Sequence, residues 1–299
     1  MENKVLLSVV MIVKNESSCL ADCLELVKKA DEIIIVDTGS TDNTCNIARK
    51  YTNKVFENEY KWEDSFCKAR NFAKSKATGK WILSIDADEV LEFNGIAKIK
   101  DAIKIAEQKK CQTIDVIMVA NGSGNEFNFP RVFRNCKEIF WKGDIHNYLN
   151  VVEKNSTDIR ILYKYSATHA NDPDRALRIL TKVIKEKPNS VREVFYLARE
   201  YWYRKDWITA SYWYQDYLKR AYWPPEWSEA WVMLARCYWN LGKINEAKDA
   251  CLQAIKINAN YKEALLLMAN LSGPGNKKAW KNYAQYANNN NVLNIRKTI

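Results

Sequence analysis

The chain has 299 residues, of which 47% are hydrophobic and 27% are charged. This length suits two ordinary domains, and the hydrophobic content is enough to bury a core, which excludes a disordered chain. The apolar run Val5–Val13 is too short to span a bilayer, and no small-residue cleavage site marks it as a signal peptide. We therefore expect a cytoplasmic protein, and a peripheral attachment to a membrane stays open.

The net charge of +10 is unevenly distributed along the chain. Residues 1–170 hold 25 Lys and Arg against 24 Asp and Glu, whereas residues 171–299 hold 21 against 12. A basic surface attracts acidic partners such as nucleic acid, anionic lipid or a phosphorylated substrate. The alternative is an ordinary solvated surface, and the charge alone does not decide between the two.

Strands and helices alternate over the first part of the chain. The expected elements, in chain order, are a strand at Leu6–Val13, a helix at Ser17–Lys29, a strand at Glu32–Val36, a helix from Asp42 to Tyr51, a strand at Lys54–Glu57, a helix at Trp62–Lys76 and a strand at Trp81–Ile85. Such alternation predicts an α/β domain with a mostly parallel sheet. Residues 113–165 add further expected strands, at Arg131–Arg134, Ile139–Trp141 and Ile159–Tyr165.

From about Asp174 the pattern changes to long amphipathic helices. Ala198, Ala235 and Ala269 recur in matching contexts at intervals of 37 and 34 residues, which is typical of tetratricopeptide repeats. We therefore divide the chain into an α/β domain at residues 1–170 and an all-α domain of about three repeats at residues 171–299. The eight cysteines form no C-x-x-C pair, so we interpret them as reduced thiols without a zinc or redox site.

Acidic residues follow two of the expected strands. Asp86-Ala87-Asp88 comes after the strand that starts at Trp81, and Asp37 ends the strand Glu32–Val36. In parallel sheets, ligands bind beyond the carboxyl ends of the strands, so these side chains should share one rim. Hard carboxylate oxygens suit Mg²⁺ or Mn²⁺ bound to a diphosphate, which would act as a Lewis acid on the leaving group. Asp37 would accept a hydrogen bond from a nucleotide base or ribose, or would only cap its own turn.

The sequence motifs of this part of the chain resemble those of the family 2 glycosyltransferases of the GT-A fold. The resemblance rests on Val9–Glu16, Asp31–Thr44, Ala69–Asn71 and Ala77–Glu89 and covers about the first 170 residues. It implies a nucleotide-sugar donor, with UDP as the expected nucleotide, and transfer with inversion. The residues it implies for donor binding are Lys14, Asn15, Asp37, Arg70, Asp86 and Ala87.

The resemblance also implies a metal site and a catalytic segment. Asp88 would ligate the cation, and His169 would complete its shell from further along the chain. Asp144 and His146 are the candidate catalytic residues in Gly143–Asn147, although Asn147 replaces the Glu that relatives often carry there. Arg131 and Arg134 would touch the diphosphate, or would be ordinary strand-surface charges.

The combination of a transferase with tetratricopeptide repeats resembles bacterial enzymes that include peptide glycosyltransferases acting on cysteine or serine. We expect the repeats to bind a peptide, protein or glycan acceptor, because their aromatic and basic residues suit a concave groove. Two alternatives remain: the repeats form a homodimer, or the transferase is degenerate and the protein is a binding scaffold. Nucleic acid is not expected as a partner, since no recognition motif accompanies the charge.

Overall fold

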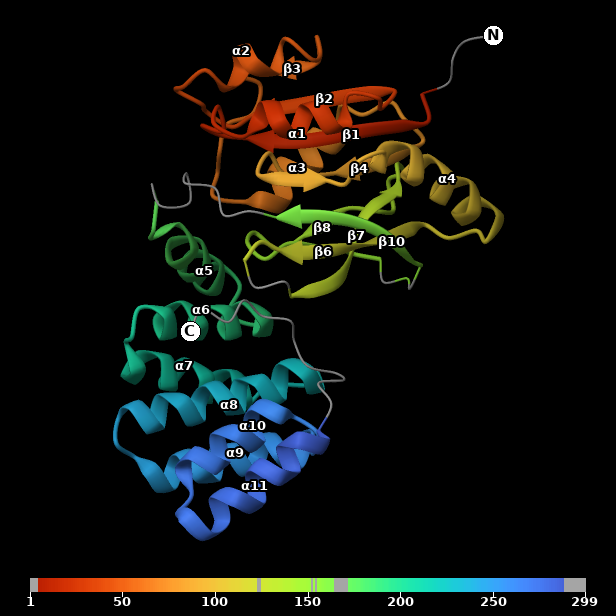
Figure 1. Ribbon diagram of the computed structural model, residues 1–299. Helices are drawn as coiled ribbons and strands as arrows, with labels where there is room; N and C mark the ends of the chain where they lie inside the picture. Colours follow the sequence, from red (N-terminus) through yellow and green to blue (C-terminus); the bar gives the residue numbers. More distant parts are fainter. Residues whose placement is uncertain (1–4, 123–124, 152, 154, 164–171, 288–299) are drawn as a thin grey trace. The chain divides into compact units, whose positions relative to one another are not determined.

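The computed structural model describes residues 5–122, 125–151, 153, 155–163 and 172–287, and it divides the chain into two compact units. The first unit, Met1–Arg175, is called the sheet domain here, and the second, Ala176–Ile299, the helical domain. The predicted boundary between residues 170 and 171 lies outside the described residues. Each domain is described by itself (Figure 1).

An eight-stranded sheet forms the centre of the sheet domain. Its strands, in spatial order, are β3 (Val55–Phe56), β2 (Glu32–Asp37), β1 (Leu7–Val13), β4 (Trp81–Ser84), β7 (Glu126–Arg134), β6 (Thr113–Ala120), β10 (Ser156–Tyr163) and β5 (Glu89–Leu91). Four of its seven strand pairings are parallel, including all those among β1, β2, β3 and β4. The expected α/β fold with a mostly parallel sheet is confirmed. A separate ribbon joins β8 (Trp141–Lys142) to β9 (Tyr148–Leu149).

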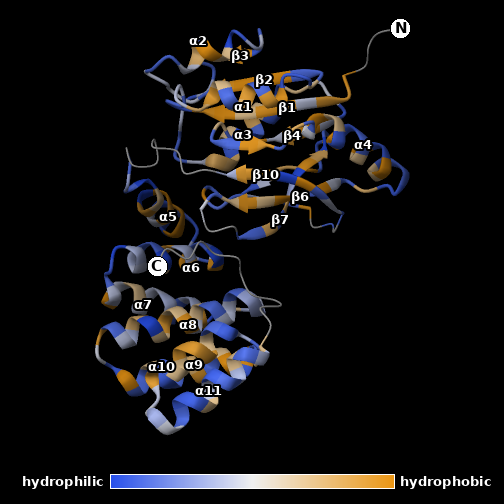
Figure 2. Cartoon of the chain, viewed as in Figure 1, coloured by the Kyte–Doolittle hydropathy of each residue, from blue (hydrophilic) through white to orange (hydrophobic). Residues whose placement is uncertain are grey.

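Both faces of the central strands are buried, which is why these strands are continuous apolar runs. Val9 and Met11 of β1 pack with Leu24 of α1 (Leu20–Val27) and with residues of α4 (Gly95–Gln108). Val10 points to the opposite face, where it packs with Ala73 of α3 (Phe66–Ser75). The remaining helix of the domain is α2 (Thr44–Ala48). Figure 2 shows the hydrophobic colour concentrated on these central strands.

Two elements of the sheet domain, β5 and α4, have no counterpart in the sequence-based prediction. β5 is only three residues long, and α4 starts without a side-chain cap. The residue before α4, Asn94, is of a type that is common at helix N-caps, but it has φ +58° and makes no capping hydrogen bond.

Up to residue 287, where the described part of the chain ends, the helical domain consists of one helix followed by three pairs of consecutive helices. These are α5 (Arg175–Glu186), then α6 (Val191–Tyr203) with α7 (Trp207–Leu218), α8 (Pro224–Asn240) with α9 (Ile244–Ile257), and α10 (Lys262–Leu271) with α11 (Pro274–Tyr286). Ala198, Ala235 and Ala269, which the repeat alignment equates, are fully buried in α6, α8 and α10. Small residues at these places let neighbouring helices pack closely, as the repeat pattern predicts.

Two further features concern the whole described chain. Among the described residues, none of the helices combines the length and the apolar character needed to cross a membrane. All eight cysteines are free, and none pairs in a disulfide.

A buried carboxylate, Glu32, ties three segments together at the amino-terminal edge of the sheet. It accepts hydrogen bonds from Ser8, from Lys54 and from the amide and hydroxyl of Thr78, the last two at 2.8 and 2.7 Å. Burial opposes the ionisation of Glu32, but the hydrogen bonds from Lys54, Ser8 and Thr78 outweigh it and lower its pKa to about 2. The carboxylate is therefore ionised in the folded protein over most of the acid range.

We expect Glu32→Gln to lower the free energy of unfolding at pH 7 by about 1–3 kcal/mol, because buried donors lose a charged acceptor. The pKa of Glu32 is depressed on folding, so its contribution is complete above about pH 4.5 and is lost as the pH falls toward 2. Urea unfolding of both proteins between pH 7 and pH 3 measures this. A stability difference that stays constant over that range would contradict the assignment.

Candidate functional site

The loops that follow β1 and β2 are joined by hydrogen bonds at the carboxyl edge of the sheet. The Asn15 amide donates to Ser40 Oγ at 2.9 Å, and Asn15 Oδ1 accepts from the Thr41 amide at 2.7 Å. Glu16 continues the series by donating its amide to Thr44 Oγ1 at 2.8 Å. Asn15 has φ +56°, a left-handed conformation that asparagine tolerates better than most residues. These contacts give the rim of the sheet a fixed shape.

Asp37, the last residue of β2, is buried and is turned toward its own loop. Its carboxylate accepts from the amides of Gly39 and Ser40, each at 3.0 Å. This is the turn-capping arrangement that the sequence offers as an alternative to nucleotide binding. An ionised carboxylate has about four acceptor positions, so these contacts leave capacity for a ligand donor as well.

A cavity of about 450 Å³ opens at the same edge of the sheet. It is lined by Ile12, Val13, Lys14, Asn15, Glu16, Thr38, Trp62, Phe66, Arg70, Asp86, Ala87, Asp88, Asp172 and Arg175. Six of the predicted donor and metal residues are therefore brought together here: Lys14, Asn15, Arg70, Asp86, Ala87 and Asp88. The volume is in the range of small-molecule binding sites.

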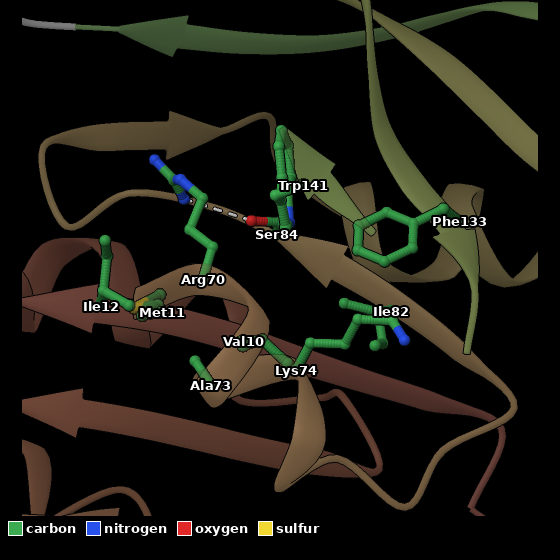
Figure 3. A pocket seen from close by; sticks show the side chains of 10 residues that line it. All are labelled: Val10, Met11, Ile12, Arg70, Ala73, Lys74, Ile82, Ser84, Phe133 and Trp141. Atoms are coloured by element: carbon green, nitrogen blue, oxygen red, sulfur yellow. Dashed lines mark hydrogen bonds between the residues drawn. The ribbon is translucent and has the colours of Figure 1, made fainter. Parts of the chain in front are cut away.

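Arg70 of α3 holds Asp86 by a two-point ion pair. Its Nη2 atom donates to Asp86 Oδ1 and Oδ2 at 2.7 and 3.0 Å, and Nη1 donates to Ser84 Oγ at 3.3 Å. The guanidinium also lies over the Trp141 ring, 5.3 Å from its centroid. Figure 3 shows Arg70, Ser84 and Trp141 in a packed crevice, which leaves no space for a water molecule. Arg70 thus fixes the orientation of Asp86, in addition to facing the cavity.

Arg131 of β7 lies near Asp86 but is not among the residues that line the cavity. It is buried and donates to Glu89, and its Nη2 atom is 3.6 Å from Asp86 Oδ2. Burial raises the pKa of Glu89, and the charge of Arg131 opposes that rise. Glu89 was not singled out in the sequence. Its only signal was a carboxylate next to the D-x-D motif within an otherwise apolar segment.

Arg134 lies at the other end of the sheet and is not among the residues that line the cavity, so the structure does not bring it together with the predicted donor residues. It pairs in register with Trp81, the first residue of β4, whereas the cavity lies beyond the last. Its guanidinium lies 5.2 Å from the Trp81 ring centroid, and its Nε donates to the Cys111 carbonyl at 3.3 Å. Arg131 lies three residues earlier on β7, next to Val132, which pairs with Leu83 toward the other end of β4.

The segment Gly143–Asn147 is attached to the amino terminus of α3. The Phe66 amide donates to the Asp144 carbonyl at 2.8 Å, and the Ser65 hydroxyl donates to the Asp144 carboxylate. Gly143 and His146 have φ values of +85° and +49°, which bend the segment sharply. Phe66 lines the cavity, but Asp144 and His146 do not. Their catalytic roles stay a prediction.

A divalent cation fits the cavity only together with a donor that supplies further oxygen ligands. Among the described residues, no group of three or more His, Cys, Asp or Glu side chains could hold a metal ion. Asp88 faces the cavity, Asp86 is engaged with Arg70, and His169 lies outside the described residues. Mg²⁺ commonly binds through one or two carboxylates plus substrate phosphates and water. The carboxylate of Asp88 together with the phosphates of a bound nucleotide would agree with that pattern.

Ser65 serves both α3 and Asp144, which allows a test of this attachment. Its hydroxyl accepts from the Lys68 amide at 3.3 Å as the N-cap of α3. We expect Ser65→Ala to lower the free energy of unfolding by about 1–2 kcal/mol. In an Asp144→Ala background the same change should cost less, about 1 kcal/mol, because only the cap is then lost. Equal losses in both backgrounds, measured by urea unfolding, would show that Ser65 and Asp144 are not coupled.

Comparison with known proteins identifies the family of this chain. The sequence model of Glycosyl transferase family 2 matches residues 8–168, and that of a tetratricopeptide repeat matches residues 228–261. A TPR repeat-containing protein of Synechococcus elongatus is 34% identical over 146 residues, which cover 48% of this chain and 35% of the relative. The glycosyltransferase SunS of Bacillus subtilis is 26% identical over 201 residues, covering 64% of this chain and 48% of SunS. The chain thus spans about a third to a half of the length of these curated relatives.

Among solved structures, S. aureus TarS 1-349 in complex with UDP-GlcNAc is 16% identical with a TM-score of 0.43, over 93% of this chain and 89% of that one. The family match, by contrast, covers more than half of the chain, including β1, β2, β4 and the D-x-D turn. The chain belongs to glycosyltransferase family 2 and carries tetratricopeptide repeats after its transferase domain.

Proposed function

We propose that this protein transfers a hexose from a UDP-linked donor to a peptide, protein or glycan acceptor, with a divalent cation and with inversion. The observation that carries the proposal is the cavity at the carboxyl edge of the sheet. There the D-x-D turn, the β1 loop and Arg70 meet around a space of about 450 Å³. This combination suits a ligand with a ring system and a diphosphate better than an apolar ligand.

The donor would be held by complementary parts of this cavity. Trp62 and Phe66 form an edge-to-face pair with ring centroids 5.0 Å apart, an apolar wall suited to the face of a base or a sugar. Lys14 is exposed at the rim, where its charge would attract the diphosphate. Asp37 ends the neighbouring strand β2, outside the residues that line the cavity, and its remaining acceptor positions would serve the base or ribose.

The cation and the catalytic base complete the proposed reaction. Asp88 would hold Mn²⁺ or Mg²⁺ together with the donor diphosphate, and His169 would be a further ligand. Such an ion stabilises the charge that develops on a leaving diphosphate. A base must take the acceptor proton in a single displacement, and Asp144 is the candidate, with His146 beside it in the chain. Asn147, in place of a Glu, motivates the competing scaffold function.

The repeats would bind the acceptor through one face of α6. Arg192, Tyr196, Arg199 and Tyr203 are spaced by four, three and four residues and therefore share a face. The guanidinium groups of Arg192 and Arg199 lie 5.1 and 4.5 Å from the Tyr196 ring centroid. Arg199 is buried, so the groups that would meet an acceptor are Arg192 and the half-exposed Tyr203.

We expect Asp88→Asn to abolish Mn²⁺-dependent hydrolysis of the UDP-sugar, because the ion loses its carboxylate. Binding of UDP without metal should stay within about threefold of the wild type, since an isosteric amide keeps the turn (a factor of three is about 0.65 kcal/mol). Calorimetry of the UDP-sugar reaction with Mn²⁺ measures the hydrolysis, and calorimetric titration with UDP without Mn²⁺ measures the binding. Asp101→Asn, on the exposed surface of α4, is the matched control.

Turnover that is unchanged in Asp88→Asn would rule out this metal site. A wild-type protein that binds UDP with Mn²⁺ but never hydrolyses or transfers the sugar would favour the scaffold function instead.

We expect Arg192→Ala and Tyr203→Ala to raise the KM for the acceptor by about tenfold each, since charged hydrogen bonds and aromatic contacts contribute on the order of 1–2 kcal/mol. The KM for the donor should not change. Lys256→Ala, exposed on α9, serves as the control. Steady-state kinetics with an acceptor found in a peptide and glycan screen checks this, and unchanged acceptor constants would separate the repeats from acceptor binding.

A further inference from the structure

Four charged side chains are packed together directly behind the D-x-D turn. Arg70 and Arg131 supply two positive charges, and Asp86 and Glu89 supply two negative charges. Arg131 and Glu89 are 7% and 3% exposed, so their pairing is almost fully removed from water. Buried charges are tolerated when each has a partner, and removing one member leaves another uncompensated. Each of the four side chains must therefore stay close to a partner of opposite charge.

Asp86 lies between the two guanidinium groups and forms an ion pair with each, the closer one with Arg70. Arg70 Nη2 contacts both of its oxygens, at 2.7 and 3.0 Å, whereas Arg131 Nη2 stays 3.6 Å from Oδ2. Arg131 instead donates its hydrogen bond to Glu89 Oε1. Glu89 thus shares Arg131 with Asp86 and takes its closer contact, which leaves Arg70 as the nearer partner of Asp86.

Glu89 also closes the turn that carries Asp88. Its second oxygen, Oε2, accepts from the Asp86 amide at 2.9 Å, and its own amide donates to the Asp86 carbonyl at 3.0 Å. These reciprocal bonds span Asp86, Ala87 and Asp88. Glu89 itself is not among the residues that line the cavity. Its influence on a ligand is therefore indirect, through the turn and through Arg131.

We propose that Glu89 is a positioning residue for sugar transfer: it holds Arg131 and the Asp86 amide, so that Asp86 stays paired with Arg70 and Asp88 faces the donor. This inference rests on the proposed UDP and cation site. Arg131 is the counter-ion that makes the buried Glu89 carboxylate tolerable. Neither residue needs to touch the substrate for the site to depend on both.

The charges of Glu89 and Arg131 can be removed singly or together, which gives a double-mutant cycle with distinct outcomes. In Glu89→Gln, Arg131 keeps its charge and its nearest carboxylate is Asp86. In Arg131→Met, Glu89 stays buried beside Asp86 without its counter-ion and without the hydrogen-bond donor that fixes it. Each single variant should weaken the binding of UDP in the presence of Mn²⁺ by about 10- to 100-fold, the usual effect of disturbing groups that orient a metal ligand.

The double variant Glu89→Gln with Arg131→Met should recover most of that affinity, to within about threefold of the wild type, because the remaining pair of Arg70 and Asp86 is balanced. Arg131→Lys keeps a cation beside Glu89 and should also stay close to the wild type. The kcat with saturating donor should follow the same order. If Glu89 and Arg131 only stabilised the fold, the variants would have lower melting temperatures, but the double variant and Arg131→Lys would not bind UDP more tightly than the single variants.

Two matched controls lie at the opposite end of the same sheet. Glu32→Gln removes another buried carboxylate, and Arg134→Met removes the neighbouring arginine of β7. Both should leave the affinity for UDP with Mn²⁺ unchanged in full-length, folded protein. Circular dichroism establishes folding, and isothermal calorimetry with UDP and Mn²⁺ gives the affinities. If Glu89→Gln does not fold, the contrast between Arg131→Met and Arg131→Lys gives the same test.

The outcomes separate this inference from the function on which it rests. A wild-type protein that does not bind UDP with Mn²⁺ overturns the proposed function and the inference with it. Wild-type binding with equal affinity in Glu89→Gln overturns the inference alone. A double variant that stays as weak as the single variants overturns the charge-balance explanation, and recovery in the double variant supports it.

Discussion

The pairing of Asp86 with Arg70 is the interaction on which the rest of the site depends. Bringing either charge out of water is costly, and the pair is stabilised because Arg70 donates hydrogen bonds to both Asp86 oxygens and to Ser84. Arg131 and Glu89 extend it to a cluster with as many positive as negative charges. The cluster draws on α3, β7, β5 and the segment between β4 and β5. A disturbance in any of these elements therefore reaches the cavity through electrostatics.

Helix α3 connects this cluster to the other side of the cavity. Its N-cap, Ser65, binds the Asp144 carboxylate; its first residue, Phe66, lines the cavity; and Arg70 follows one turn later. The loops after β1 and β2 are joined independently through Asn15. The cavity is thus bounded by segments whose side chains already have partners. Such preorganisation reduces the ordering that binding a donor would require.

The helical domain is built on a different principle. Its consecutive helices pack through fully buried alanines, and its aromatic side chains fill the wider gaps, as in the contact of Phe195 with Tyr217, whose ring centroids are 5.3 Å apart. Some aromatics stay on the surface, such as Tyr212 at 63% exposure. A repeat domain of this kind presents a long surface without needing a catalytic group. The proposed division places chemistry in the sheet domain and acceptor recognition in the repeats.

The sequence by itself determined the features that depend on local pattern. Apolar runs predicted the buried strands, the turn after Trp81–Ile85 placed the D-x-D motif at a sheet edge, and recurring alanines predicted the repeats. Family resemblance then identified six residues that the cavity brings together, and the match to Glycosyl transferase family 2 confirms that resemblance.

Only the tertiary structure decided which charges meet. Arg131 and Arg134 look equivalent in the sequence, yet the register of β7 against β4 sends one toward Asp86 and the other toward Trp81. Ser65 binds Asp144 across 79 residues of sequence, and Arg131 binds Glu89 across 42. No local pattern encodes such pairs, because the partners become neighbours only when strand order and register are fixed.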